Sequence, residues 1–260
     1  MALHIEVVGE GPPLVLIHGW GLHGGVFAPL VDRLSDRYQL YLPDLPGHGY
    51  SREDPTPLTL QACTAEILAR TPPAAWLGWS LGGLFAMHAA SVSSRVRALA
   101  LIAATPRFVR GQDWPHAVEA SVFEQFGKDL QQDYRGTLER FLALDTIGSE
   151  HARAELRTLK ENLHARGEPA PQALLQGLAL LEQSDLRAAL PALSISSLWI
   201  SGHRDRLVSP AAMAEAAAAA PGSRHVDIAG GGHAPFLGHA DQVAHEISSF
   251  MNKVEHVGAT

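Results

Sequence analysis

Short apolar runs alternate with amphipathic stretches along the first hundred residues of the chain. The apolar runs are nearly continuous and are typical of strands buried on both faces of a sheet: Leu14–Ile17, Gln39–Leu42, Ala75–Leu77 and Ala98–Ala103. The stretches between them carry apolar residues at helical spacing: Val26–Leu34, Leu60–Arg70 and Leu81–Ala90. Because strand and helix alternate, the sequence predicts right-handed crossovers and a mostly parallel sheet, with Leu3–Val8 as an edge strand.

The pattern changes between Arg107 and Ala189, where helical periodicity replaces the strand-like runs. Helices are predicted there over Val118–Leu130, Thr137–Leu144, Ala152–Leu163 and Ala173–Leu181. The α/β pattern then resumes with strands at Leu198–Ser201 and His225–Ile228 and helices at Ala211–Ala220 and Gln242–Val254. We therefore predict an α/β core of residues 1–106 and 190–260, and an inserted all-helical cap of residues 107–189.

Composition and charge narrow the class of protein. The 260 residues are 46% hydrophobic and 18% charged, as in globular chains, and the single cysteine cannot form an internal disulfide. A formal net charge of −7 disfavours binding to nucleic acid. The first residues lack the features of a signal peptide, and the longest apolar run, Ala98–Ala104, is too short to span a bilayer. We expect a soluble, cytoplasmic protein with no nucleic-acid or membrane partner.

The sharpest chemical signal is the string Gly78-Trp79-Ser80-Leu81-Gly82. A strand-like segment precedes it and a helix-like segment follows, which is the setting of a nucleophile elbow. The glycines suit a crowded, strained turn that lifts the serine hydroxyl toward a helix N-terminus. The alternative is a chance serine in an ordinary strand-to-helix turn. We predict that Ser80 is a catalytic nucleophile.

A serine nucleophile needs a base and an orienting carboxylate. In the serine–acid–histidine chain order that goes with a nucleophile elbow, each partner follows a later strand. Asp205 lies in the loop after the strand at Leu198–Ser201, and His233 lies among glycines after the strand at His225–Ile228. We predict Asp205 and His233 as the acid and the base. Asp227 is a weaker rival for the acid because it lies within a strand.

The loop His18-Gly19-Trp20-Gly21 follows the strand at Leu14–Ile17 directly. Such a loop can aim a backbone N–H at the nucleophile, and the residue after the nucleophile supplies a second donor. We predict the amides of Trp20 and Leu81 as an oxyanion hole, and expect His18 to hold the loop in shape. Core packing is the alternative role for the Trp20 ring.

These motifs and the segment Pro43–Ser51 resemble the α/β-hydrolase superfamily over essentially the whole chain. Three segments resemble more narrowly the carboxylesterases of biotin synthesis: Leu16–Leu22, Trp76–Leu84 and Glu139–Leu144. The resemblance implies an α/β-hydrolase fold with a helical cap over the serine. It also implies cleavage of the methyl ester of a pimeloyl chain on acyl-carrier protein, which frees pimeloyl-carrier and methanol.

The same resemblance implies a substrate site between cap and core. It assigns to that site Trp20, Ser80, Leu81, Phe141, Leu142, Ala143, Leu144, Asp145 and His233. Phe141 and Leu144 also fit the apolar stripe of an ordinary cap helix, and both descriptions can hold together.

An acidic carrier protein would be repelled at long range by a chain of net charge −7, so the resemblance requires a local basic patch. Arg153, Arg157 and Lys160 share one helical stripe, and Arg140 lies one predicted helix earlier. We predict these four residues as the carrier-docking patch. A solvated charged face is the equally open alternative.

Other activities remain open or are disfavoured on specific residues. A dehalogenase or epoxide hydrolase of this fold would use an aspartate where Ser80 stands. A general short-chain carboxylesterase, a thioesterase, or a serine-triad lyase or C–C hydrolase would share the three predicted residues. An inactive binding module would be expected to lack one of them. The sequence has no H-E-x-x-H motif or clustered metal-ligand spacing, so we expect no metal and no cofactor.

Overall fold

The computed structural model describes residues 3–258. The strands of this part of the chain are β1 (Ile5–Val8), β2 (Pro13–Ile17), β3 (Gln39–Pro43), β4 (Ala74–Trp79), β5 (Val96–Ile102), β6 (Ser197–Gly202) and β7 (Ser223–Ile228). Its α-helices are α1 (Ala28–Leu34), α2 (Leu60–Arg70), α3 (Leu81–Val92), α4 (Ala120–Gln132), α5 (Tyr134–Thr146), α6 (Ala152–Ala165), α7 (Pro171–Gln183), α8 (Pro210–Ala219), α9 (Pro235–Gly238) and α10 (Ala240–Gly258). None of these described helices has the length and apolar character needed to cross a membrane.

The strands form one sheet in the order β1-β3-β2-β4-β5-β6-β7. β1 pairs antiparallel with β3, and the remaining neighbours are parallel. The mostly parallel sheet confirms the fold class predicted from alternating strand and helix patterns. β1 is shorter than the predicted Leu3–Val8 because its ladder with β3 begins at Ile5.

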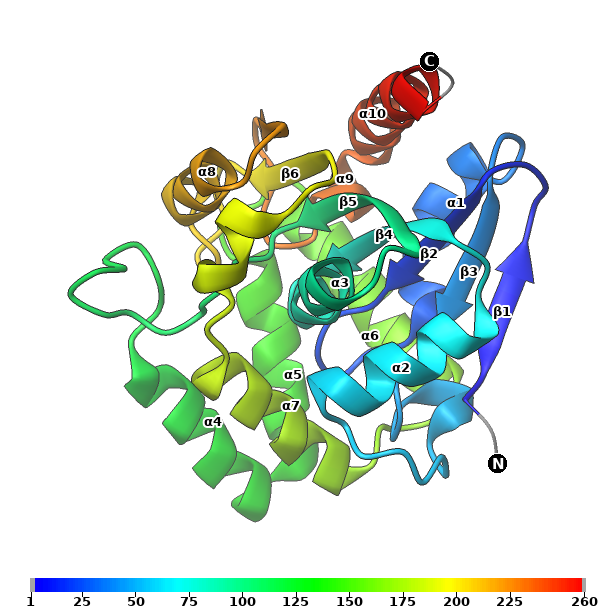
Figure 1. The fold of residues 1–260 in the computed structure, drawn as a ribbon. Helices are drawn as coiled ribbons and strands as arrows, with labels where there is room; N and C mark the ends of the chain where they lie inside the picture. Colours follow the sequence, from blue (N-terminus) through cyan, green and yellow to red (C-terminus); the bar gives the residue numbers. More distant parts are fainter. Residues whose placement is uncertain (1–2, 259–260) are drawn as a thin grey trace.

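Helices cover both faces of this sheet (Figure 1). α2 and α3 lie on one face, where α3 packs on β4 and β5, while α1 and α10 pack together on the other. Every residue of β4 is buried, which explains its continuous apolar sequence. The edge strand β7 is only half-buried along most of its length and accordingly carries polar residues.

A helical insert, α4 to α7, separates β5 from β6, as the sequence predicted, and it lies beside the sheet in Figure 1. Within it α4 contacts α5 and α7, and α5 contacts α6. The insert meets the core where α7 reaches α3 and where α6 reaches α9. We propose the predicted range 107–189 as the extent of this cap.

Most helix boundaries differ from the prediction by one to four residues, and those of α4 and α10 have identifiable causes or consequences. A helix was expected from Val118, but Val118 forms a β-bridge with Val109, and its amide donates to the carbonyl of Phe108. α4 therefore begins at Ala120. The last helix was expected over Gln242–Val254 and instead runs from Ala240, with Asp241 in its first turn, to Gly258. The predicted end of the core, Thr260, lies outside the described residues.

Candidate active site

Ser80 occupies a strained turn between β4 and α3. Its φ of 52° and ψ of −120° lie in a region that residues with a side chain rarely adopt. The Ser80 amide donates to the Ile102 carbonyl at 3.0 Å, and the Ser80 carbonyl accepts from the Gly83 amide at 2.9 Å. These contacts hold the strained backbone in place, so the turn presents the hydroxyl in one fixed direction.

Glycine is required on both sides of Ser80 because β2 packs against Gly82 and the backbone at Gly82 packs against Gly78. A Cβ added to Gly82 would lie 2.1 Å from the carbonyl oxygen of Ile17. A Cβ added to Gly78 would lie 2.4 Å from the carbonyl oxygen of Gly82. Both distances are far shorter than a van der Waals contact, so the G-x-S-x-G spacing follows from packing as well as from backbone strain.

The imidazole of His233 lies between Ser80 and Asp205. Its Nε2 is 2.8 Å from Ser80 Oγ, and its Nδ1 is 2.8 Å from Asp205 Oδ2. With its proton on Nδ1, His233 donates to Asp205 and accepts from the Ser80 hydroxyl. Ser80 is 2% exposed, Asp205 is 5% exposed and His233 is 1% exposed, so the hydrogen bonds that join them are shielded from water.

Asp205 is fixed as an acceptor by the loop that follows β6. Its second oxygen, Oδ1, accepts hydrogen bonds from the backbone amides of Leu207 and Val208 at 2.8 and 3.0 Å. These amides stabilise the carboxylate and orient it toward His233. Asp227, the rival acid, instead bonds to His203 and to the Ser201 hydroxyl.

Two contacts hold the loop that carries His233. The His233 amide donates to the carbonyl of Asp145 on α5, and the Trp79 indole donates to the carbonyl of His233 at 2.8 Å. A cap helix and the residue before Ser80 therefore both position the imidazole. The sequence contained Trp79 in the elbow motif but gave no sign that its ring would hold the base.

Burial and charge compete in setting the pKa of His233. Burial lowers this pKa, but the charge and hydrogen bond of Asp205, together with the charge of Asp145, outweigh it and leave the pKa raised. Burial raises the pKa of Asp145 itself to about 7, with the charge of Asp205 adding to the rise and that of His233 opposing it. Asp145 is thus a second acid that acts electrostatically on the base.

The predicted oxyanion donors come from two segments, the Leu81 amide from the elbow and the Trp20 amide from the loop after β2. Leu81 is the first residue of α3, so its N–H has no acceptor within the helix. The Trp20 loop is braced by His18, whose Nε2 accepts from the Leu45 amide and whose Nδ1 donates to the Gly19 carbonyl. Burial lowers the pKa of His18 to about 3, so its imidazole is neutral and serves as a brace.

Aromatic rings of the cap pack against the Trp20 loop of the core. The Trp20 indole donates to the Leu174 carbonyl of α7 at 2.9 Å, and its ring lies 4.5 Å from that of Phe141 on α5. Phe141 also packs on Phe126 of α4. Of the predicted pocket residues on α5, Phe141, Leu142 and Asp145 are buried, whereas Ala143 and Leu144 are half-buried.

The predicted docking patch divides into paired and unpaired cations. Arg140 forms ion pairs with Asp129 and Asp133, and Lys160 bonds to Glu139 at 2.6 Å. Arg153 and Arg157 are exposed on α6, and no ion pair joins either to another described residue. Two of the four predicted residues therefore already neutralise acids of the cap.

A serine held by an imidazole that is held by a carboxylate is the arrangement of serine hydrolases. A family model described as the alpha/beta hydrolase fold matches residues 12–240, and the chain belongs to that family. Within it, the chain is a member of the pimeloyl-[acyl-carrier protein] methyl ester esterases. A relative of that name from Xanthomonas oryzae pv. oryzae is 67% identical over 252 residues, covering 97% of this chain and 100% of the relative.

A second relative agrees with this placement, and a solved structure agrees with the fold. An esterase of the same name from Stenotrophomonas maltophilia is 66% identical over 249 residues, which cover 96% of each chain. The solved structure of a bromoperoxidase from Bacillus anthracis superposes with a TM-score of 0.88 at 23% identity, covering 96% of this chain and 95% of that one. The second likeness shows the fold alone, and the curated relatives show the family. The chain is accordingly a carboxylic ester hydrolase.

The effect of the Asp145 charge on the pKa of His233 can be tested through the pH profile of ester hydrolysis. Asp145→Asn removes a negative charge that raises the pKa of His233. The base then stays neutral down to a lower pH, so we expect the acidic limb of kcat/KM to move to lower pH. The measurement is kcat/KM against pH with a small p-nitrophenyl ester.

Asp227→Asn is the matched control, because that carboxylate bonds to His203 and Ser201 instead. Asp227→Asn should leave the acidic limb of kcat/KM at the same pH as in the wild type. An acidic limb that stays still or moves to higher pH in Asp145→Asn would contradict the assigned coupling.

Proposed function

We propose that this chain hydrolyses the methyl ester of pimeloyl-[acyl-carrier protein], with Ser80 as nucleophile, His233 as general base and Asp205 as its orienting acid. The observation that carries the proposal is the unbroken hydrogen-bonded line from Ser80 Oγ through His233 to Asp205, with both links at 2.8 Å. The names of the relatives supply the substrate.

In the first half of the reaction, the Ser80 oxygen attacks the ester carbonyl as His233 Nε2 takes the hydroxyl proton. Asp205 keeps the other imidazole proton on Nδ1 and stabilises the imidazolium. The amides of Trp20 and Leu81 stabilise the oxyanion, and one such donor contributes about 10²–10³-fold in rate. His233 then protonates the methoxide oxygen, the C–O bond breaks, and methanol leaves an acyl-Ser80.

In the second half, His233 takes a proton from water as the water oxygen attacks the acyl carbonyl. The bond to Ser80 breaks, the serine oxygen recovers its proton from His233, and the free carboxylic acid leaves. No step requires a group beyond these side chains, two amides and water. The same three residues could serve a general short-chain esterase or thioesterase, so the substrate is decided by what surrounds them.

The cap carries an apolar region suited to a long acyl chain. A cavity of about 460 Å³ lies on α4, and Phe126 and Arg140 are among its lining residues. Phe126 packs on Phe141, and Phe141 packs on Trp20 beside the proposed oxyanion hole. This row of packed aromatic rings connects the wall of the cavity to the Trp20 loop, and in this proposal the methylene groups of the acyl chain lie along these rings when the cap moves away from the core.

Docking of an acidic carrier rests, in this proposal, on Arg153 and Arg157 of α6. Both side chains are exposed, and no ion pair with another described residue neutralises either of them. Arg140 and Lys160 contribute less because each already contacts a carboxylate. As an enzyme acting on a carrier-borne intermediate of biotin synthesis, the protein would work in the cytoplasm.

Ser80→Ala tests the proposed reaction directly. Removing the hydroxyl should lower kcat for the carrier-borne methyl ester by about 10⁵–10⁶-fold while the substrate still binds. In a biotin auxotroph that lacks this esterase, the wild-type gene should restore growth and the variant should not. Wild-type turnover by Ser80→Ala, or failure of the active wild-type enzyme to restore growth, would contradict the reaction or the role respectively.

Charge reversal on α6 tests the docking surface. Arg153→Glu with Arg157→Glu should raise KM for the carrier-borne ester about tenfold or more and leave a p-nitrophenyl ester unaffected, because only the carrier reaches α6. Arg97→Glu with Lys253→Glu is the matched control. It makes the same change in net charge around a cavity at the amino ends of the strands, which Arg97 helps to line. Equal effects on both substrates, or on both double variants, would remove the docking proposal.

A further inference from the structure

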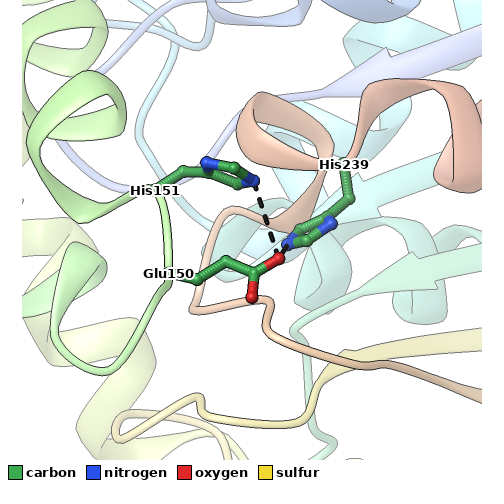
Figure 2. A group of neighbouring side chains, drawn as sticks. All are labelled: Glu150, His151 and His239. Atoms are coloured by element: carbon green, nitrogen blue, oxygen red, sulfur yellow. Dashed lines mark ion pairs between the residues drawn. The ribbon is translucent and has the colours of Figure 1, made fainter.

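Two histidines and a glutamate meet at the seam between cap and core (Figure 2). Glu150 and His151 lie in the segment between α5 and α6, and His239 directly follows α9. The sequence gave no sign of this cluster, because His239 is 88 positions from His151 and neither belongs to a metal-binding motif.

The spacing of the three side chains fits a metal ion. Oε1 of Glu150 is 3.6 Å from Nε2 of His151 and 3.6 Å from Nε2 of His239. A hydrogen bond of that length is poor. In a tetrahedral zinc site with bonds of about 2.0–2.1 Å, neighbouring ligand atoms are about 3.3–3.4 Å apart. All three ligand atoms lie within 4.8 Å of one another, so small side-chain rotations would complete the geometry.

Unpartnered polar atoms form a second and independent indication. Nε2 of His239 is buried and has no hydrogen-bond partner among the described residues, and the same holds for Oε2 of Glu155. Glu155 is 2% exposed, and its Oε1 lies 2.5 Å from where a Cβ on Gly238 would be, beside His239. A buried nitrogen without a partner and a buried carboxylate without full satisfaction are costly unless a ligand compensates them.

We propose that Glu150, His151 and His239 bind one divalent transition-metal ion, of which zinc is the best fit. Two imidazole nitrogens with one carboxylate oxygen form a ligand set that zinc accepts, whereas magnesium and calcium prefer sets made of oxygen ligands alone. Three protein ligands leave a fourth position for water. The carboxyl group of Glu155, whose pKa is raised by burial, lies beside the site.

Such an ion would fasten the cap to the loop that carries the catalytic base. The Glu150 amide donates to the Gly230 carbonyl at 3.0 Å, and a Cβ on Gly230 would lie 2.4 Å from the Glu150 carboxyl carbon. His239 follows His233 by six residues, across the short helix α9. The ion joins the segment before α6 to His239, the Glu150–Gly230 hydrogen bond joins the same segment to Gly230, and together they stabilise the closed arrangement of cap and core.

The test uses the full chain, freed of metal with a chelator and titrated with Zn²⁺ by calorimetry. We expect one ion per chain and a Tm rise of roughly 5–10 °C at a free concentration of 100 times Kd. His151→Ala and Glu150→Gln should each weaken binding about tenfold or more. Both side chains are nearly half exposed, so neither change threatens folding. Mg²⁺ should give no shift.

His116→Ala is the matched control, since His116 is an exposed histidine of the cap outside the cluster. It should bind Zn²⁺ like the wild type. Binding by His151→Ala or Glu150→Gln within tenfold of wild type, or an equal loss in His116→Ala, would show an adventitious ion only and overturn the proposal. Absence of saturable Zn²⁺ binding by the wild-type chain would overturn it as well.

Discussion

Parallel strands end at one edge of a sheet, and this constraint brings together a serine, a carboxylate and an imidazole that are far apart in the sequence. Ser80 follows β4, Asp205 follows β6 and His233 follows β7. Gly202 and Ile228, the last residues of β6 and β7, pair with each other. The loops that carry Asp205 and His233 therefore begin side by side at the same edge of the sheet. A Cβ on Gly202 would lie 2.0 Å from the Gly232 carbonyl oxygen, which shows how closely the two loops pack.

The cap contributes more than a cover over this site. The Asp145 carbonyl accepts from the His233 amide, and the Leu174 carbonyl accepts from the Trp20 indole. Both the base and the oxyanion loop are thus positioned by helices of the insert. Since Ser80 is 2% exposed, we infer that an ester reaches it only when cap and core separate. Contacts along the seam, including the proposed metal site, would then govern access.

The sequence predicted the features that depend on local pattern. Strand and helix periodicity indicated the sheet and the insert, and the crowded turn around Ser80 accounts for glycine at Gly78 and Gly82. Chain position alone preferred Asp205 to Asp227, and the structure sets Asp205, not Asp227, within hydrogen-bond distance of His233.

Features that depend on long-range packing could not be predicted. Val118 pairs with Val109 instead of starting a helix, which a helical periodicity cannot anticipate. The pairing of Arg140 with Asp129 and Asp133 depends on how α4 and α5 lie together. The effect of Asp145 on His233, and the meeting of His151 with His239, arise only when cap and core dock, so neither leaves a pattern in the chain.

The central claim is that the Ser80 oxygen is made nucleophilic by His233. Reaction of the native enzyme with a fluorophosphonate, followed by peptide mass spectrometry, tests it most directly. The account predicts one adduct per chain, on Ser80, forming at least a thousandfold more slowly in His233→Ala. An unlabelled native enzyme, an adduct on another residue, or labelling of Ser80 that is indifferent to His233 would contradict it.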